Sequence, residues 1–206
     1  MTFRTYTRTL TSRTKFLRGL RIKSLDQLGT HGGAGFATPQ TSVTRVRVFG
    51  IDPGSRSTGF CVIDCTGSRL EHIASGAIAT SGRQFTDRLR TIFERMRELI
   101  EEYAPEEIAI ERVFVHKNAD SALKLGQARG AALCAVLNGE MRIFEYAPRA
   151  VKHALVGYGA AEKSQVAWMV RQTLDFNGRL AADAADALAL AICHAHSRNY
   201  QKRVAQ

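Results

Sequence analysis

The sequence predicts one α/β domain with a mixed sheet, preceded by a basic extension over residues 1–45. Three short apolar runs joined by polar turns begin the domain, and this arrangement favours an antiparallel meander. After them, helical and strand-like segments alternate along the chain, which implies a layered α/β structure. The length of 206 residues agrees with this division, since it suits one domain of about 150 residues with an appendage.

The predicted meander begins with the apolar run Val46–Ile51, which ends in the turn Asp52-Pro53-Gly54. A short apolar run before a Pro-Gly turn is typical of a strand. Two further strands are predicted at Gly59–Ile63 and Leu70–Ile78, on either side of the polar turn Thr66-Gly67-Ser68.

The apolar period changes after the meander, and large apolar residues then recur at intervals of three and four. This pattern predicts an amphipathic helix from Phe85 to Tyr103, ended before Pro105. In the helix that follows, Gly126 and Gly130 stand four residues apart, which favours close approach of a partner helix or a second copy. The other predicted elements are the strands Ile108–Ile110 and Arg142–Tyr146 and the helices Asn118–Leu137, Arg149–Leu155, Glu162–Leu174 and Ala181–Ser197.

The net charge of +10, from 29 Lys and Arg against 19 Asp and Glu, suggests a polyanionic partner, nucleic acid first. Most of this charge lies in residues 1–45, where eight basic residues and one acid give +7, so the domain 46–206 carries only +3. No apolar run approaches the roughly 18 residues of a membrane helix, so no membrane-spanning segment is expected, and no membrane partner is predicted. The 4 cysteines are too few for a disulfide scaffold and indicate a cytoplasmic protein.

The basic extension is open to three interpretations. Its Arg- and Ser-rich, acid-poor composition is typical of an organelle transit peptide. A disordered basic arm that contacts DNA phosphates would have the same composition. A start codon assigned too far upstream would also produce it, because the domain begins near Val46 and no Met stands between Met1 and Met96.

Two acids follow predicted strands at the point where each strand ends. Asp52 closes the first strand and Glu111 closes the fourth. Open α/β sheets place their ligands at the carboxyl edge, so both acids are candidate functional residues. Alternatively, each is a turn or capping acid.

A second pair of acids, Asp183 and Asp186, lies at the start of the last predicted helix. Their spacing of three puts them on one helical face, and that face continues with Ala187 and Leu190 toward the apolar side. Like charges there are unfavourable unless cations meet them, although the helix dipole also favours acids in a first turn. Four acids that converge on one edge would form an all-oxygen site for a hard ion such as Mg²⁺ or Mn²⁺.

Four motifs closely resemble the RuvC family of bacterial Holliday-junction resolvases, in one register from about Val46 to His196. The most specific is the block from Asn118 to Gly130. The four motifs are Phe49-Gly-Ile-Asp-Pro-Gly-Ser-Arg-Ser-Thr-Gly59, Ile110-Glu-Arg-Val-Phe114, Lys117-Asn-Ala-Asp-Ser-Ala-Leu-Lys-Leu-Gly-Gln-Ala-Arg-Gly130 and Ala182-Asp-Ala-Ala-Asp-Ala-Leu-Ala189.

The resemblance implies a ribonuclease H-like fold with a mixed five-stranded sheet, whose first three strands are antiparallel and which helices flank. It implies a homodimer that makes symmetric nicks in four-way junction DNA, with two Mg²⁺ ions per subunit and Mn²⁺ as a substitute. It also implies cooperation with the RuvA–RuvB branch-migration complex. The family's catalytic and metal-binding positions fall on Asp52, Glu111, Asp183 and Asp186.

Three further positions take DNA-binding roles from the same resemblance. Phe114 matches an aromatic residue that stacks on bases near the junction centre, although core packing is the alternative. Lys152 and Lys163 match basic positions near the scissile backbone, while a solvated first-turn lysine is the alternative for Lys163.

Three rival functions remain open at this point. The Asp52-Pro-Gly turn also resembles the phosphate loop of actin-like ATPases, but residues 46–206 are too few for the two lobes of such an enzyme. A catalytically inactive junction-binding module would have little reason to keep four acids that repel DNA. Another ribonuclease H-like nuclease, acting on RNA or on RNA–DNA hybrids, would share the same acids.

Overall fold

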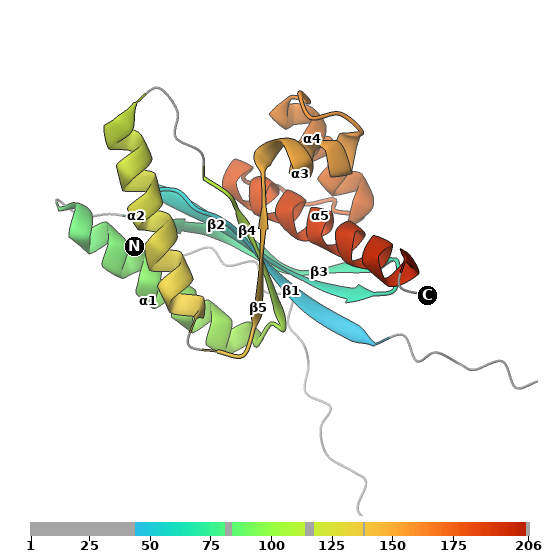
Figure 1. Ribbon diagram of the computed structural model, residues 1–206, viewed down its shortest axis with the longest axis horizontal. Coiled ribbons are helices and arrows are strands. Elements are labelled where there is room, and N and C mark those ends of the chain that lie inside the picture. The colour runs from blue at the N-terminus through green and yellow to red at the C-terminus, as the bar shows by residue number, and fades with distance from the viewer. Residues whose placement is uncertain (1–43, 81–83, 114–117, 138, 205–206) are drawn as a thin grey trace, which may run out of the picture. The chain divides into compact units, whose positions relative to one another are not determined.

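The computed structural model describes residues 44–204, apart from 81–83, 114–117 and 138 (Figure 1). The predicted basic extension therefore lies almost wholly outside the described residues. Arg45, its last residue, instead begins the first strand. Among the helices described, none is long and apolar enough to cross a membrane.

The sheet has five strands in the order β3-β2-β1-β4-β5. The first three strands form the predicted antiparallel meander: β1 (Arg45–Asp52), β2 (Ser57–Thr66) and β3 (Arg69–Ala79). The other two, β4 (Glu107–Glu111) and β5 (Arg142–Tyr146), continue the sheet in parallel with β1. The prediction of a mixed sheet with antiparallel first strands is confirmed.

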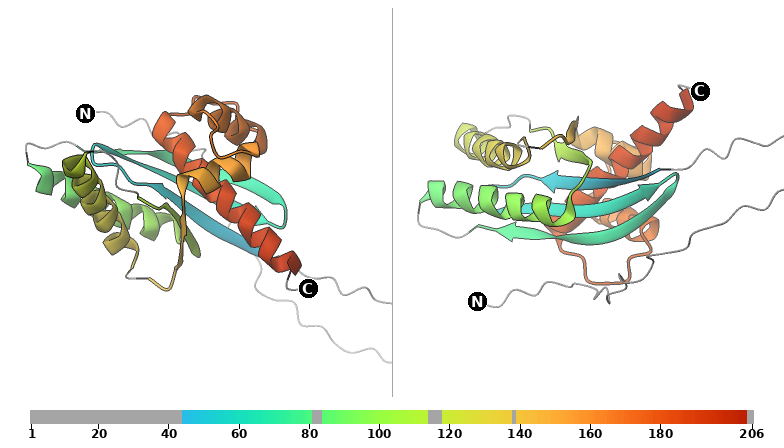
Figure 2. Two further views of the ribbon diagram at one scale, coloured as in Figure 1. Left: turned by 45° about the horizontal axis from the view of Figure 1, so that its top comes forward. Right: turned by 90° about the horizontal axis from the view of Figure 1, so that it is seen from below.

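Helices cover both faces of the sheet (Figures 1 and 2). One face carries α1 (Phe85–Tyr103) and α2 (Ala119–Val136), and the other carries α3 (Pro148–Val156), α4 (Lys163–Thr173) and α5 (Ala182–Val204). Most predicted bounds differ from the observed ones by one or two residues. The exceptions are β2, which is longer at both ends, and α5, which continues past the predicted end at Ser197. In this extension Asn199 donates a hydrogen bond to the Gly67 carbonyl in the β2–β3 turn.

Alternation along β1 sorts its side chains between two hydrophobic cores. Val46 and Val48 pack with the α3, α4 and α5 layer, whereas Phe49 and Ile51 pack with α1 and α2. Since successive strand residues point to opposite faces, Asp52 shares the face of Val46 and Val48. The strand therefore directs Asp52 toward the layer that contains α5.

A buried ionic cluster ties α5 to the opposite end of β4. The Glu107 side chain is 1% exposed and pairs with Arg142, with Nε2 of His194 at 2.7 Å and with Nε of Arg198 at 2.7 Å. The Tyr146 hydroxyl contacts Nδ1 of the same histidine at 2.7 Å. Burial alone would raise the pKa of Glu107, but hydrogen bonds from His194 and Arg198 outweigh it and hold that pKa below its ordinary value.

Candidate active site

The register of the sheet brings Asp52 and Glu111 side by side. The strands β1 and β4 are parallel, with Ile51 opposite Ile110, so the next residue on each strand is an acid. Both acids stand at carboxyl ends, where an α/β sheet presents its ligand-binding edge. Glu111 follows Ala109 by two residues and so shares its face, which packs against α5.

Two glycines let the first turns of α5 approach the sheet. A Cβ at Gly50 would lie 2.4 Å from the Ala187 carbonyl oxygen, and one at Gly59 would lie 2.1 Å from that of Asp183. Real Cβ atoms do not approach so closely, so only glycine fits at either position. The helix start that carries Asp183 and Asp186 therefore lies directly over β1 and β2.

A cavity of about 300 Å³ opens between these elements. Asp52, Glu111 and Asp186 line it, together with Lys152 from α3 and Lys163 from α4. Apolar side chains complete its wall: Pro148, Val151, Val166, Ala189 and Leu190. Three carboxylates and two ammonium groups from five separate segments thus share one small volume.

Burial and like charges raise the pKa of the two strand acids. Desolvation comes first for Asp52, and repulsion from Glu111, Asp186 and Asp183 adds to it, which raises the pKa to about 8 against the lowering effect of Lys163. Burial and the charge of Asp186 likewise raise the pKa of Glu111, against Lys163 and Lys152. The site therefore favours added positive charge, since a cation would relieve this repulsion.

The two helix acids are each held by a partner from elsewhere in the chain. The Ser57 hydroxyl donates to Oδ2 of Asp183 at 2.5 Å, and the Lys163 ammonium donates to Oδ2 of Asp186 at 2.6 Å. This pair raises the pKa of Lys163. Lys163 is placed by the start of α4, where Glu162 and Gln165 form a capping box.

The structure brings together most of the predicted site residues. Five of them line the cavity: Asp52, Glu111, Asp186, Lys152 and Lys163. Asp183 lies close enough to Asp52 for its charge to raise the pKa of Asp52, whereas Phe114 lies outside the described residues. In the part of the chain that is described, no three His, Cys, Asp or Glu side chains stand where they could share one ion in this arrangement. The all-oxygen donor set suits Mg²⁺, but the carboxylates of Asp183 and Asp186 face their protein partners.

Sequence reasoning missed Ser57, Gly50 and Gly59. All three lie in or beside the Phe49–Gly59 motif, but nothing local distinguishes them, because their partners are more than 120 residues away in α5.

Residues 48–194 match the family model described as crossover junction endodeoxyribonuclease RuvC. The chain belongs to the RuvC family. It is 53% identical over 160 residues to the RuvC of Methylococcus capsulatus, covering 78% of this chain and 96% of that protein. It is 49% identical over 158 residues to the RuvC of Alkalilimnicola ehrlichii, covering 77% of this chain and 96% of that protein.

Solved structures agree with this membership. The structure of Thermus thermophilus RuvC in complex with a Holliday junction substrate matches this fold with a TM-score of 0.70 and 32% sequence identity. The match covers 76% of this chain and 96% of the Thermus chain. The predicted family, ribonuclease H-like fold class and enzyme class, a crossover junction endodeoxyribonuclease, are thereby confirmed. A RuvC-family enzyme hydrolyses phosphodiester bonds, and the acidic cavity is its candidate active site.

Proposed function

We propose that this RuvC-family enzyme resolves four-way (Holliday) DNA junctions in homologous recombination and repair. It makes symmetric nicks in two strands and leaves 5′-phosphate and 3′-hydroxyl ends. The observation that carries the proposal is the cavity in which Asp52, Glu111 and Asp186 meet Lys152 and Lys163. The likeness to a family member solved with a Holliday junction substrate supports the choice of DNA.

Asp52, Glu111, Asp183 and Asp186 would hold two Mg²⁺ ions, with Asp52 shared between them and Mn²⁺ as a substitute. Four oxygen donors and the raised pKa values of Asp52 and Glu111 support a divalent cation here. When bound, the ions would supply an activated water and neutralise charge on the leaving oxygen. Asp186 would exchange its bond to Lys163 for an ion, whereas Asp183 would keep the Ser57 hydroxyl on Oδ2 and offer its other oxygen.

The two lysines act on the phosphate rather than on the ions. Lys163, released from Asp186, is placed to steady a non-bridging oxygen of the scissile phosphate. Lys152 lines the same cavity from α3 and adds positive charge at the DNA backbone. Phe114 follows Glu111 by three residues, and we assign it the stacking of an exposed base near the junction centre.

Symmetric cleavage calls for two copies, and the exposed face of α2 is the proposed dimer seam. Leu123, Gly126, Gly130, Cys134 and Leu137 recur there at intervals of three and four, opposite the buried Ala128 and Ala132. Leu123 is 64% exposed and Leu137 62% exposed. A Cβ at Gly126 or Gly130 would meet no described atom within 4 Å, so the backbone there is open to a second copy.

The deciding experiment is cleavage of a synthetic four-way junction by the full chain in Mg²⁺. We expect paired nicks in the junction, against little cleavage of a duplex or an RNA–DNA hybrid of the same sequence. Preferred cleavage of the hybrid would favour another ribonuclease H-like nuclease, and junction binding without cleavage would favour an inactive module. Cooperation with a RuvA–RuvB complex and action in a bacterial cytoplasm stay predictions from the family.

A Leu123→Arg variant tests the seam. A buried charge at a self-paired helix face would leave the chain monomeric in analytical ultracentrifugation, and Lys124→Gln on the neighbouring helix face serves as a control. Crosslinking of Cys134 to its counterpart by a bifunctional maleimide would support the same seam. A dimeric Leu123→Arg variant would contradict it.

A further inference from the structure

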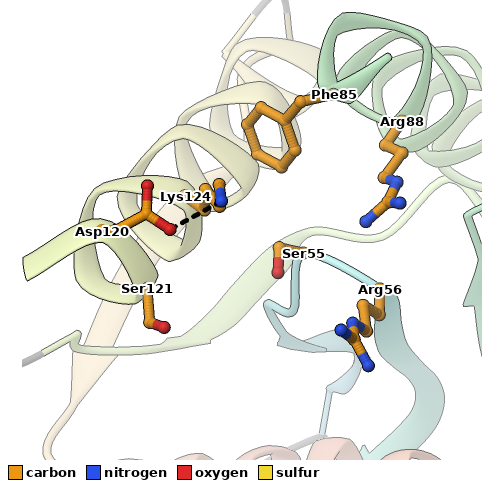
Figure 3. A pocket seen from close by; sticks show the side chains of 7 residues that line it. All are labelled: Ser55, Arg56, Phe85, Arg88, Asp120, Ser121 and Lys124. Atoms are coloured by element: carbon orange, nitrogen blue, oxygen red, sulfur yellow. Dashed lines mark hydrogen bonds and ion pairs between the residues drawn. The ribbon is translucent and has the colours of Figure 1, made fainter. Parts of the chain in front are cut away.

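A second cavity, of about 440 Å³, lies where three segments meet at the α1 and α2 side of the sheet (Figure 3). The β1–β2 loop contributes Ser55 and Arg56 to it, and the first turn of α1 contributes Phe85 and Arg88. The first turns of α2 contribute Asp120, Ser121 and Lys124. We call this cavity the basic pocket.

Positive charge exceeds negative charge in the basic pocket. Three of its side chains are cationic, and only Asp120 is acidic. Lys124 donates to Asp120 at 2.6 Å, but both side chains are exposed, so water screens this pair. Within the residues that the structure describes, neither Arg56 nor Arg88 forms an ion pair, and the one acid of the pocket is paired with Lys124.

Arg88 has a polar atom that no described group satisfies. Its Nε is buried, and within the described part of the chain this N–H has no hydrogen-bond acceptor. Leaving a buried donor of a charged group unpaired is unfavourable, so a further acceptor would stabilise this side chain. Figure 3 shows the guanidinium group of Arg88 beside the opening between α1, α2 and the β1–β2 loop.

The chemistry of the basic pocket suits a phosphate group. A guanidinium offers several N–H donors in a fixed fork, which matches the oxygens of a phosphate. The hydroxyls of Ser55 and Ser121 can donate to further oxygens, and Lys124 adds a second charge. The pocket thus offers donors from three segments to one anion.

The β1–β2 loop connects the basic pocket to the acidic cavity. This loop leaves the strand at Asp52, supplies Ser55 and Arg56 to the pocket and continues to Ser57, which holds Asp183. Only Pro53 and Gly54 separate Asp52 from Ser55 in the pocket, so a nucleic-acid strand bound at Asp52 would lie near the pocket. We propose that the basic pocket binds a backbone phosphate of the DNA junction other than the scissile one, a role that rests on the proposed function.

The test compares Arg88→Gln and Lys124→Gln with a matched control, Arg90→Gln. Arg90 lies two residues along the same helix, is exposed and does not line the pocket, so the change in net charge is identical. Each variant is combined with Asp52→Asn to prevent cleavage, and junction affinity is measured over a series of salt concentrations. Each lost phosphate contact lowers the slope of log affinity against log salt by about 0.9, and the control keeps the slope of its parent.

Single methylphosphonate substitutions in the junction locate the phosphate. We expect a substitution at one phosphate, distinct from the scissile one, to weaken junction binding several-fold for the parent and for Arg90→Gln. The same substitution should not weaken binding by Arg88→Gln any further. An Arg88→Lys variant keeps the charge without the fork and should recover only part of the affinity. Melting temperatures check that each variant folds, and the exposed Lys124 provides a variant whose folding is not at risk.

The outcomes separate the pocket from the proposed function. If the wild-type chain cuts the junction and Arg88→Gln and Lys124→Gln behave like Arg90→Gln, the pocket proposal is overturned alone. If inorganic phosphate stabilises the wild type but not Arg88→Gln, while junction affinity is unchanged, the pocket binds a free anion and the proposal is again overturned. If the wild type does not distinguish a junction from a duplex, the proposed function itself fails.

Discussion

The carbonyl oxygen of Asp183 lies so close to Gly59 that a Cβ on residue 59 would stand 2.1 Å from it. This contact joins the second strand to the first turn of α5 across more than 120 residues of sequence. Asp183 and Asp186 owe their position over the carboxyl end of β1 to it, so the geometry of the site depends on a residue without a side chain.

Replacing Gly59 with alanine should push α5 away from the sheet. We expect the free energy of unfolding to fall by about 1–3 kcal/mol, as in other overpacked cores, and junction cleavage to fall with it. Denaturant unfolding and a cleavage assay measure the two effects. Wild-type stability and cleavage in Gly59→Ala would contradict the role of the contact.

Ser57→Ala should impair catalysis without unfolding the chain. The Ser57 hydroxyl orients Asp183, and loss of such an orienting group typically costs about 10–100-fold in activity or metal affinity. We expect a higher Mg²⁺ requirement in the cleavage assay, an unchanged junction affinity, and partial recovery in Ser57→Thr. Full activity at limiting Mg²⁺ would show that Asp183 needs no such partner.

Asp52→Asn should abolish cleavage but raise stability in the absence of divalent ions. In the folded chain, burial and like charges raise the pKa of Asp52 to about 8, well above its ordinary value of 3.8. An acid with a raised folded pKa costs stability progressively as pH rises between those values. In EDTA, the gain in melting temperature over wild type should therefore grow from pH 5 to pH 8 and then level off.

The same pair of proteins tests the cation site without an activity assay. The raised pKa of Asp52 reflects repulsion that a bound cation would relieve, so Mg²⁺ should raise the melting temperature of the wild type. Asp52→Asn should respond much less. Two results would argue against the charge cluster. One is a difference in melting temperature between Asp52→Asn and wild type that does not change from pH 5 to pH 8, and the other is an equal effect of Mg²⁺ on both proteins.

Glu107→Gln should be strongly destabilising, although Glu107 is remote from the acidic cavity. Its side chain is 1% exposed and pairs with Arg198, which is 15% exposed, so its loss leaves a largely buried positive charge unpaired. Breaking a buried ion pair in this way costs about 3–5 kcal/mol, which chemical denaturation would measure. The exposed Glu140→Gln removes the same charge and should have almost no effect. Similar losses for both variants would refute this role.

Local patterns in the sequence were sufficient for the elements and for the choice of acids. A short apolar run before a Pro-Gly turn predicted β1 and its end at Asp52, and a period of three to four predicted α1 from Phe85 to Tyr103. The spacing of three placed Asp183 and Asp186 on one helical face. These inferences succeeded because backbone geometry alone relates near neighbours in the chain. The motifs then carried the family resemblance, which the comparisons confirmed.

Only the tertiary structure decided how those acids meet and what holds them. Ser57 on Asp183, Lys163 on Asp186 and Gly59 under α5 are contacts between segments far apart in sequence. The basic pocket likewise depends on Arg56, Arg88 and Lys124 arriving from three segments. Such contacts follow from how layers pack, and packing depends on the shapes of all the facing side chains, which no local period records.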